Sequence, residues 1–263
     1  MASIDTIKIN FHSVISEIRG CVDYYSNKGE VTNAIKSSLR TDEGARYHKG
    51  VIDDKFIKIK FSSDIYYNSF FVLLCASYEN FLTETLKESL NRLSVCKNKS
   101  LIPEKLKRMN TKFSGSLLTT LDKKPSHLRI DYNEIIENLN KGIDGKGEYQ
   151  FNKEIVFYVK GILKLESFID FLDKFDLELK IEKFANTEEF KSYFEERNRE
   201  SERVLEIENK HNSIFRIRNN IAHNGRSADV TKEKLIEVLN FLEAFTNGLS
   251  KLIDNSIKLK YSE

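Results

Sequence analysis

Residues that break helices are scarce in this sequence. Its 263 residues include two prolines and eleven glycines. Because these are the two residues least favourable inside a helix, their scarcity favours long helices over a β fold rich in turns. With 40% hydrophobic and 31% charged residues, the chain is too apolar to be disordered and long enough to bury a core. We expect an all-α fold with residues 1–263 in a single domain.

Cysteine is scarce as well, and long apolar runs are absent. Cys21, Cys75 and Cys96 are far apart, without a Cys-x-x-Cys pair or a histidine at ligand spacing. This spacing disfavours a disulfide framework or a zinc site and predicts buried, reduced thiols. No apolar stretch reaches the roughly 20 residues of a membrane-spanning helix, and the N-terminus lacks a signal-peptide pattern. We expect a cytoplasmic protein with no metal site, no cofactor and no membrane contact.

Apolar residues at three- and four-residue spacing predict the core helices of a bundle. The expected segments are about 4–24, 62–95, 187–223 and 231–254. The second segment is apolar around much of its circumference, which is typical of a central helix. Gly225 is a natural stop after the third, because glycine accepts the left-handed conformation at a helix end. Thr231 is expected to cap the fourth, with Val230 and Leu235 as a hydrophobic staple.

The remaining segments are expected to be less regular. We predict polar, irregular chain at 26–55 and an irregular insertion at about 97–160. Alternating or β-branched runs at 56–61 and 154–159 indicate one or two short strands. Shorter helices are expected around 102–109, 131–141 and 163–175.

Positive charge is concentrated in two islands. From Lys97 to Arg129 nine basic residues face two acidic ones, a local excess of seven. From Lys210 to Ala228 four basic residues occur and no acidic one. Such islands indicate a polyanionic partner, although solvated helix faces produce the same pattern. The candidate contacts to a polyanion are Arg216, Arg226, Lys123, Lys124 and Arg129.

Arg218 and His223 carry the chemistry that the sequence suggests. Histidine titrates near neutral pH, so it can exchange a proton with a ribose 2′-hydroxyl or a leaving 5′-oxygen. Arginine can grip two oxygens of a phosphorane with its planar fork. Asn219, Asn220 and Asn224 can position substrate or imidazole without adding charge. Arginine and histidine together therefore suit the cleavage of a phosphodiester, with RNA as the candidate polyanion.

The spacing of Arg218 and His223 constrains how they can cooperate. On an ideal helix five residues turn through about 140°, so the two side chains point to different sides. They can serve one site if the helix ends there, as Gly225 suggests, or if two copies of the chain bring their motifs together. A purely structural role is also open, since histidine near a helix end offsets the dipole and arginine pairs with glutamate.

The segment Ile214–Gly225, which reads IFRIRNNIAHNG, resembles the signature of the HEPN superfamily. In that family an Arg-x4–6-His element, often with a polar residue after the arginine, lies near the end of a core helix. The segment Phe71–Leu82 resembles the helix that carries a Tyr/Phe-Glu-x-Phe pattern in the larger bacterial members of RiboL-PSP and MAE type. The resemblance covers about 205–255 and 65–93. One departure is Gly225, where short toxins of the family have a tyrosine that is modified.

This resemblance implies a helical bundle of HEPN type and a homodimer whose paired motifs build one composite site. It also implies a metal-independent endoribonuclease that leaves a 2′,3′-cyclic phosphate, in a toxin–antitoxin, abortive-infection or anti-phage role, with a neutralising or regulatory protein as a further partner. Arg218 and His223 would then be catalytic. The alternative is a non-catalytic HEPN-type module that binds RNA or nucleotide.

Two further residues call for an interpretation. Glu79 lies in the most apolar helix, where a lone carboxylate is costly unless it is paired. It is a candidate either for orienting Arg218 or for a structural salt bridge. His211 is twelve residues before His223 on the same expected helix, too far to join one site within a single chain, and we expect it at the surface.

Overall fold

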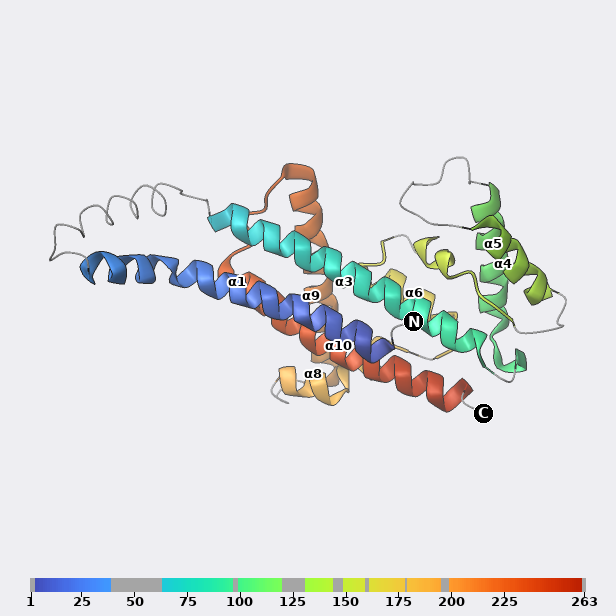
Figure 1. Ribbon diagram of the computed structural model, residues 1–263. Coiled ribbons are helices and arrows are strands. Elements are labelled where there is room, and N and C mark those ends of the chain that lie inside the picture. The colour runs from blue at the N-terminus through green and yellow to red at the C-terminus, as the bar shows by residue number, and fades with distance from the viewer. Residues whose placement is uncertain are drawn as a thin grey trace.

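Three long helices lie side by side in the computed structural model and form the body of the molecule (Figure 1). They are α1 (Ile4–Ser38), α3 (Ser63–Ser94) and α10 (Lys232–Tyr261). The helix α9 (Glu200–Asn224) crosses behind α3, and its C-terminal end projects past the bundle (Figure 1). The structure describes residues 3–38, 63–96, 99–119, 131–143, 149–158, 161–177, 179–194 and 199–261. Within these ranges the fold is all-α, as predicted.

The apolar stripes of these helices meet in one core. Phe11 of α1, Tyr78 of α3 and Phe245 of α10 are all buried. The ring of Tyr78 lies 5.8 Å from that of Phe11 and 6.2 Å, edge to face, from that of Phe245. Such aromatic contacts add to the large apolar area that each ring removes from water. The prediction of α3 as the central helix is therefore confirmed.

α1 is longer than the sequence suggested. The segment from Ser26 to Ser38, expected to be irregular, continues the helix. The buried apolar stripe ends at Val22, and the extension runs out beyond the other helices (Figure 1), where Val31 is exposed. It is attached at its base by Tyr25, whose ring stacks on Tyr66 of α3 at 4.4 Å. The predicted strand 56–61 lies outside the described residues.

The helix expected over 187–223 is two helices, so that prediction was wrong. α8 spans Glu188–Tyr193, and α9 begins at Glu200 after Arg199, whose backbone is extended. The Arg199 N–H donates to the Glu202 carboxylate at 2.9 Å, which closes the start of α9. Phe190 holds α8 against α10, with its ring 5.9 Å from that of Phe245. Packing on α10 thus separates α8 from α9, which instead crosses α3.

Shorter helices connect the long ones. They are α4 (Glu104–Thr119), α5 (Tyr132–Ile143), α6 (Leu165–Asp173), α7 (Ile181–Ala185) and two 3₁₀ segments, η2 (Lys99–Leu101) and η4 (Lys153–Tyr158). The predicted strand at 154–159 was wrong, because its described part belongs to η4. Ile155 and Val156 are both buried, whereas neighbouring side chains of a strand point to opposite faces.

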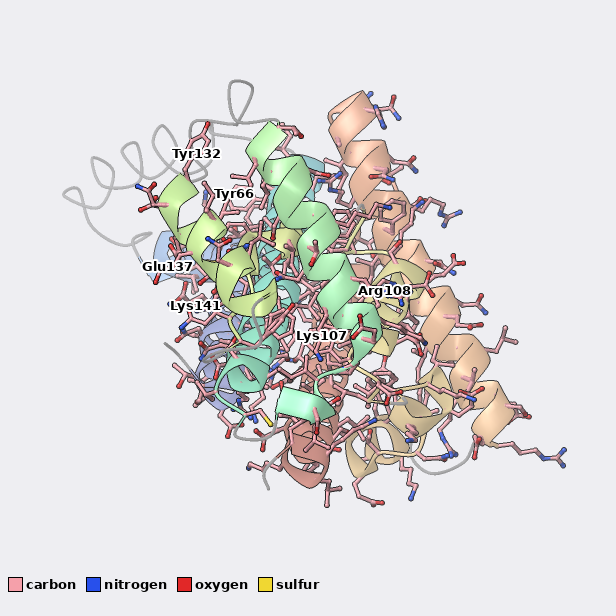
Figure 2. All side chains as sticks on the ribbon, turned by 90° about the vertical axis from the view of Figure 1, so that its right-hand side faces the viewer. Tyr66, Lys107, Arg108, Tyr132, Glu137 and Lys141 are labelled. Carbon is pink, nitrogen blue, oxygen red and sulfur yellow. The ribbon has the colours of Figure 1, made fainter. Side chains whose placement is uncertain are left out.

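The described residues within the insertion at 97–160 include α4, α5, η2 and η4, so this part of the chain is more regular than predicted. α4 and α5 pack together beside the C-terminal end of α3 (Figure 1). Figure 2 shows this end of the molecule, with Lys107 on α4 and Lys141 on α5. Beneath them Asn152 is buried and donates to the Ser114 hydroxyl at 2.7 Å, while its side-chain oxygen accepts a bond of 2.9 Å from Asn138. These buried polar contacts leave no hydrophobic periodicity in the sequence, and they add to the apolar packing of Leu117 of α4 on Ile135 of α5.

The last helix begins as predicted and ends later. The Thr231 hydroxyl accepts a hydrogen bond of 3.2 Å from the Lys234 N–H, and Val230 and Leu235 are both buried. The helix continues to Tyr261, whose hydroxyl donates to the Phe175 carbonyl at 2.7 Å. This contact explains the extension beyond residue 254.

The structure also bears on the expectations for the cysteines and for membrane-spanning helices. Cys75 and Cys96 are buried free thiols, whereas Cys21 is exposed, so the prediction of buried thiols was wrong for Cys21. Among the helices described, none combines the length and the apolar character that crossing a membrane requires.

Candidate active site

The Arg-x4-His element occupies the last two turns of α9. The helix stays regular through His223 and Asn224 and ends at Gly225, which has a positive φ of 73°. The Gly225 N–H donates to the Ile221 carbonyl at 2.8 Å, which closes the helix. The predicted stop at Gly225 is confirmed. It comes after the motif, however, so the helix does not bend between Arg218 and His223.

Arg218 and His223 differ in their surroundings. Arg218 is partly buried, and its Nη1 donates to the Asn219 side-chain oxygen at 3.3 Å. His223 is exposed, and no hydrogen bond or ion pair links its imidazole to another described residue. Because regular helix joins the two, their side chains point about 140° apart. Within one chain they do not converge on a common point.

The exposed face of α9 gathers several of the other candidates. Asn219 is four residues before His223 and Arg216 is seven before it, so both share the side of the helix on which His223 lies. Arg216 is exposed, and Asn219 and Asn220 are partly exposed. Asn224 and Arg226 are exposed at the helix end. The helix therefore presents one histidine, one arginine and amide groups to the surroundings.

Glu79 and Arg218 approach the same side chain without forming an ion pair with each other. The thiol of Cys75 is buried, and burial raises its pKa to about 12. The charge of Arg218 acts against this shift, and the charge of Glu79 adds to it. Both charged groups thus lie near Cys75 on α3. A direct contact through which Glu79 orients Arg218 stays a prediction.

The loop after the motif is fixed to α3 by Asn68, a residue that sequence reasoning missed. The Ser227 N–H donates to the Asn68 side-chain oxygen at 2.8 Å, and the Asn68 amide donates to the Ser227 carbonyl at 3.2 Å. Asn68 and Ser227 are both buried. This pair of bonds holds the segment that carries Gly225 and Arg226. The available signal was a polar residue inside the most apolar helix.

We expect Asn68→Leu to destabilise the protein by about 1–3 kcal/mol, because it leaves the buried N–H and C=O of Ser227 without partners. Urea unfolding measures the loss. Hydrogen exchange at the Ser227 amide should become faster in the same variant. Ser69→Ala, on the exposed side of the same turn, is the control and should change little. An Asn68→Leu protein as stable as the parent would show that the clamp contributes nothing.

His211 is buried, so its predicted surface position was wrong. It lies in the core on α9, and its Nε2 is 2.7 Å from the Tyr78 hydroxyl. Its Nδ1 has no hydrogen bond of ordinary geometry, and the nearby Leu163 backbone acts to raise the pKa of the ring. Burial dominates and lowers the pKa of His211 to about 4. This histidine therefore links α9 to α3 as a neutral core residue.

The two basic islands are smaller than the sequence suggested. Lys210 pairs with Glu237 of α10 and Glu206 of its own helix. On α4, Lys105 pairs with Asp173, and Arg108 lies 3.6 Å from Glu104. α4, which carries Lys105 and Arg108, lies at the C-terminal end of α3, away from the motif (Figure 1). Lys123, Lys124 and Arg129 lie outside the described residues.

A comparison with protein-family models identifies the chain. The model described as RiboL-PSP-HEPN matches residues 35–255, most of the sequence. The chain belongs to the RiboL-PSP-HEPN family. The resemblance read from the motif is thereby confirmed, and it extends well beyond the two segments that carried it. Searches of curated proteins and of solved structures found no match.

Within this RiboL-PSP-HEPN protein the motif helix α9 is held from two sides. His211 anchors its middle to α3. The Asn68 clamp holds the loop that follows it. Between these anchors the helix end stays exposed. A rigid support beneath an exposed polar surface is the arrangement that binding and catalytic groups require. Among the described residues, no cluster of histidine, cysteine and carboxylate side chains could hold a metal ion.

Proposed function

We propose that this protein is an endoribonuclease that cleaves RNA without a metal ion. The observation that carries the proposal is the position of the Arg-x4-His element in a RiboL-PSP-HEPN chain. His223 is exposed at the end of a supported helix, and its imidazole has no hydrogen bond or ion pair with the part of the chain that the structure describes. An imidazole in that position can take a proton from a ribose 2′-hydroxyl.

In the proposed reaction His223 and Arg218 have separate roles. The 2′-oxygen attacks the adjacent phosphorus, and the P–O bond to the leaving 5′-oxygen breaks. His223 exchanges the protons that these two oxygens lose and gain, and Arg218 stabilises the negative charge on the phosphorane. The products are a 2′,3′-cyclic phosphate and a 5′-hydroxyl. Asn219, Asn220 and Asn224 would hold the substrate or the imidazole.

The proposal includes a homodimer with a composite site. Arg218 and His223 point to different sides of one regular helix, so one phosphate cannot easily contact both within a single chain. A second copy related by twofold symmetry would place its own motif opposite the first. In such a pair, Arg218 of one copy can act with His223 of the other. RNA is the substrate, and a neutralising or regulatory protein is a further proposed partner.

We expect the purified protein to cleave single-stranded or structured RNA in the presence of EDTA. The new ends should be a 2′,3′-cyclic phosphate and a 5′-hydroxyl, which mass spectrometry of the fragments identifies. Cleavage that required added Mg²⁺ would contradict the mechanism. Tight RNA binding with no turnover would select the non-catalytic module instead. Growth arrest on expression, relieved by the His223→Ala variant, would support a toxin or anti-phage role.

A further inference from the structure

A pocket lies where the N-terminal part of α3 meets the end of the motif helix. Its volume is about 420 Å³, within the range of roughly 300–1,000 Å³ that is usual for small-molecule sites. Ile65 and Val72 of α3 and Ile221 of α9 supply apolar walls. Ser69 and Arg226 supply a hydroxyl and a cation. Apolar walls with a few polar groups suit a flat, partly polar ligand.

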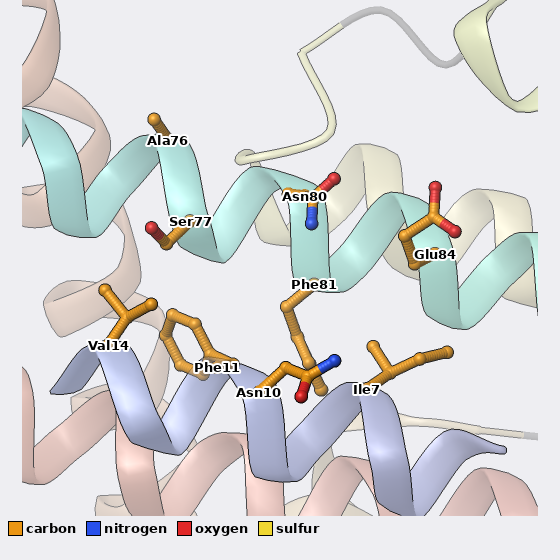
Figure 3. A pocket seen from close by; sticks show the side chains of 9 residues that line it. All are labelled: Ile7, Asn10, Phe11, Val14, Ala76, Ser77, Asn80, Phe81 and Glu84. Carbon is orange, nitrogen blue, oxygen red and sulfur yellow. The ribbon is translucent and has the colours of Figure 1, made fainter. Parts of the chain in front are cut away.

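The charge of this pocket distinguishes it from two other pockets of similar volume. The pocket between α1 and α3 contains Glu84 and no basic residue (Figure 3). The pocket between α6 and α9 is lined by four carboxylates and one lysine. The pocket beside the motif contains Arg226 and no acidic side chain. A polyanion is therefore favoured at this pocket and disfavoured at the other two.

The pocket also lies next to Arg218. Ile221, in its wall, is one helical turn after Arg218, and these two positions lie on neighbouring parts of the helix surface. Val72, in the opposite wall, is one turn before Cys75, whose thiol is close enough to Arg218 for that charge to influence it. Arg218 precedes Ile221 on α9, and Arg226 follows it and lines the pocket. Arg226 is therefore the cation available to a phosphate at this pocket.

We propose that this pocket binds one nucleotide of a single-stranded RNA, adjacent to a phosphate held by Arg226. The base packs against Ile65, Val72 and Ile221. The Ser69 hydroxyl donates to the Ile65 carbonyl at 2.7 Å, so its oxygen is left to accept a hydrogen bond from the polar edge of the base. The inference rests on the proposed function and names a subsite for its substrate. It implies that the enzyme discriminates between bases next to the cleaved bond.

The test measures binding of a short single-stranded RNA in which every 2′-hydroxyl is methylated, so that the strand cannot be cleaved. Ser69→Trp fills the pocket from an exposed helix position, where the fold tolerates a large side chain. We expect it to weaken binding about tenfold or more, the scale of losing one base contact. Asn80→Trp is the matched control, because Asn80 is also exposed on α3 but lines the pocket between α1 and α3 instead (Figure 3). It should bind like the parent.

A second variant tests the charge. We expect Arg226→Ala to weaken RNA binding. The slope of log affinity against log salt concentration should become shallower by about one, as the loss of one phosphate contact predicts. Unchanged affinity in both Ser69→Trp and Arg226→Ala would overturn the inference. Light scattering on each variant shows whether the pocket is instead part of an interface with a second copy of the chain. If Ser69→Trp dissociates the dimer and RNA affinity falls only to the extent that the dimer is lost, the subsite inference would also be overturned.

The outcomes separate this inference from the proposed function. RNA that binds through the pocket but is not cut when its 2′-hydroxyls are free would contradict only the ribonuclease proposal. Cleavage with unchanged affinity and base preference in Ser69→Trp would contradict only the subsite. A parent protein that binds no RNA would contradict both.

Discussion

We expect His223→Ala to lower the rate of RNA cleavage by at least about 100-fold, the scale of losing a general acid–base group. The imidazole is exposed at the end of α9 and makes no hydrogen bond within the described chain, so its removal should leave the fold intact. Single-turnover cleavage of a labelled RNA in EDTA measures the rate. Thermal unfolding of the same sample should match that of the parent.

Asn212→Ala is a matched control, because Asn212 is exposed on the same helix three turns earlier. Its cleavage rate should equal that of the parent. Full activity in His223→Ala would remove the histidine from the mechanism. Equal loss in both variants would instead indicate that the whole face of α9 binds RNA and that His223 has no chemical role.

The second large effect is a loss of stability in mild acid caused by His211. Its ordinary pKa is 6.5, and burial lowers the pKa to about 4 in the folded protein. Above pH 6.5 the ring is neutral in both states. As the pH falls below 6.5, the unfolded chain binds a proton that the folded chain does not, so stability decreases. The loss is complete below about pH 4 and amounts to about 3 kcal/mol.

Urea unfolding at pH 7 and at pH 4 measures this loss, and a double variant isolates it. Tyr78→Phe with His211→Leu removes both partners of the buried hydrogen bond and leaves no unpaired group. Carboxylates titrate in both proteins, so the difference between them reports the histidine. We expect the parent to lose about 3 kcal/mol more than the double variant. Equal losses would show that His211 accepts its proton without unfolding.

Much of the fold near the motif could be predicted because it depends on interactions between residues that are close in the sequence. The stop at Gly225 and the cap at Thr231 each depend on residues within a few positions of each other. The central position of α3 follows from an apolar surface on most of its circumference. The composition of the chain was enough to exclude a fold rich in turns.

Other features could not be predicted because they depend on contacts between distant segments. His211 is buried because α3 and α10 close over it, and a histidine alone does not reveal this. Asn68 binds Ser227, which is 159 residues away in the sequence. The break between α8 and α9 follows from the packing of Phe190 on α10. The turn at η4 has adjacent buried residues, a pattern that also occurs in buried strands.

The candidate site illustrates both cases. The residue types at Arg218 and His223 indicate phosphodiester chemistry, and their spacing poses the problem of geometry. The helix stays regular through His223 and ends only at Gly225. A helix end between Arg218 and His223 therefore cannot bring the two side chains together. The pocket beside Ile221 depends on where α3 crosses α9, so no spacing in the sequence indicates it.

The composite site is the central claim, and a mixed dimer tests it most directly. Arg218→Ala and His223→Ala chains carrying different tags are co-expressed, and the dimer with one copy of each is purified. Each variant alone should be inactive. If Arg218 of one copy acts with His223 of the other, the mixed dimer keeps one intact pair of two and recovers about half of the parent's cleavage rate. A mixed dimer as inactive as either single variant would contradict the claim, as would full activity in a protein that light scattering shows to be a monomer.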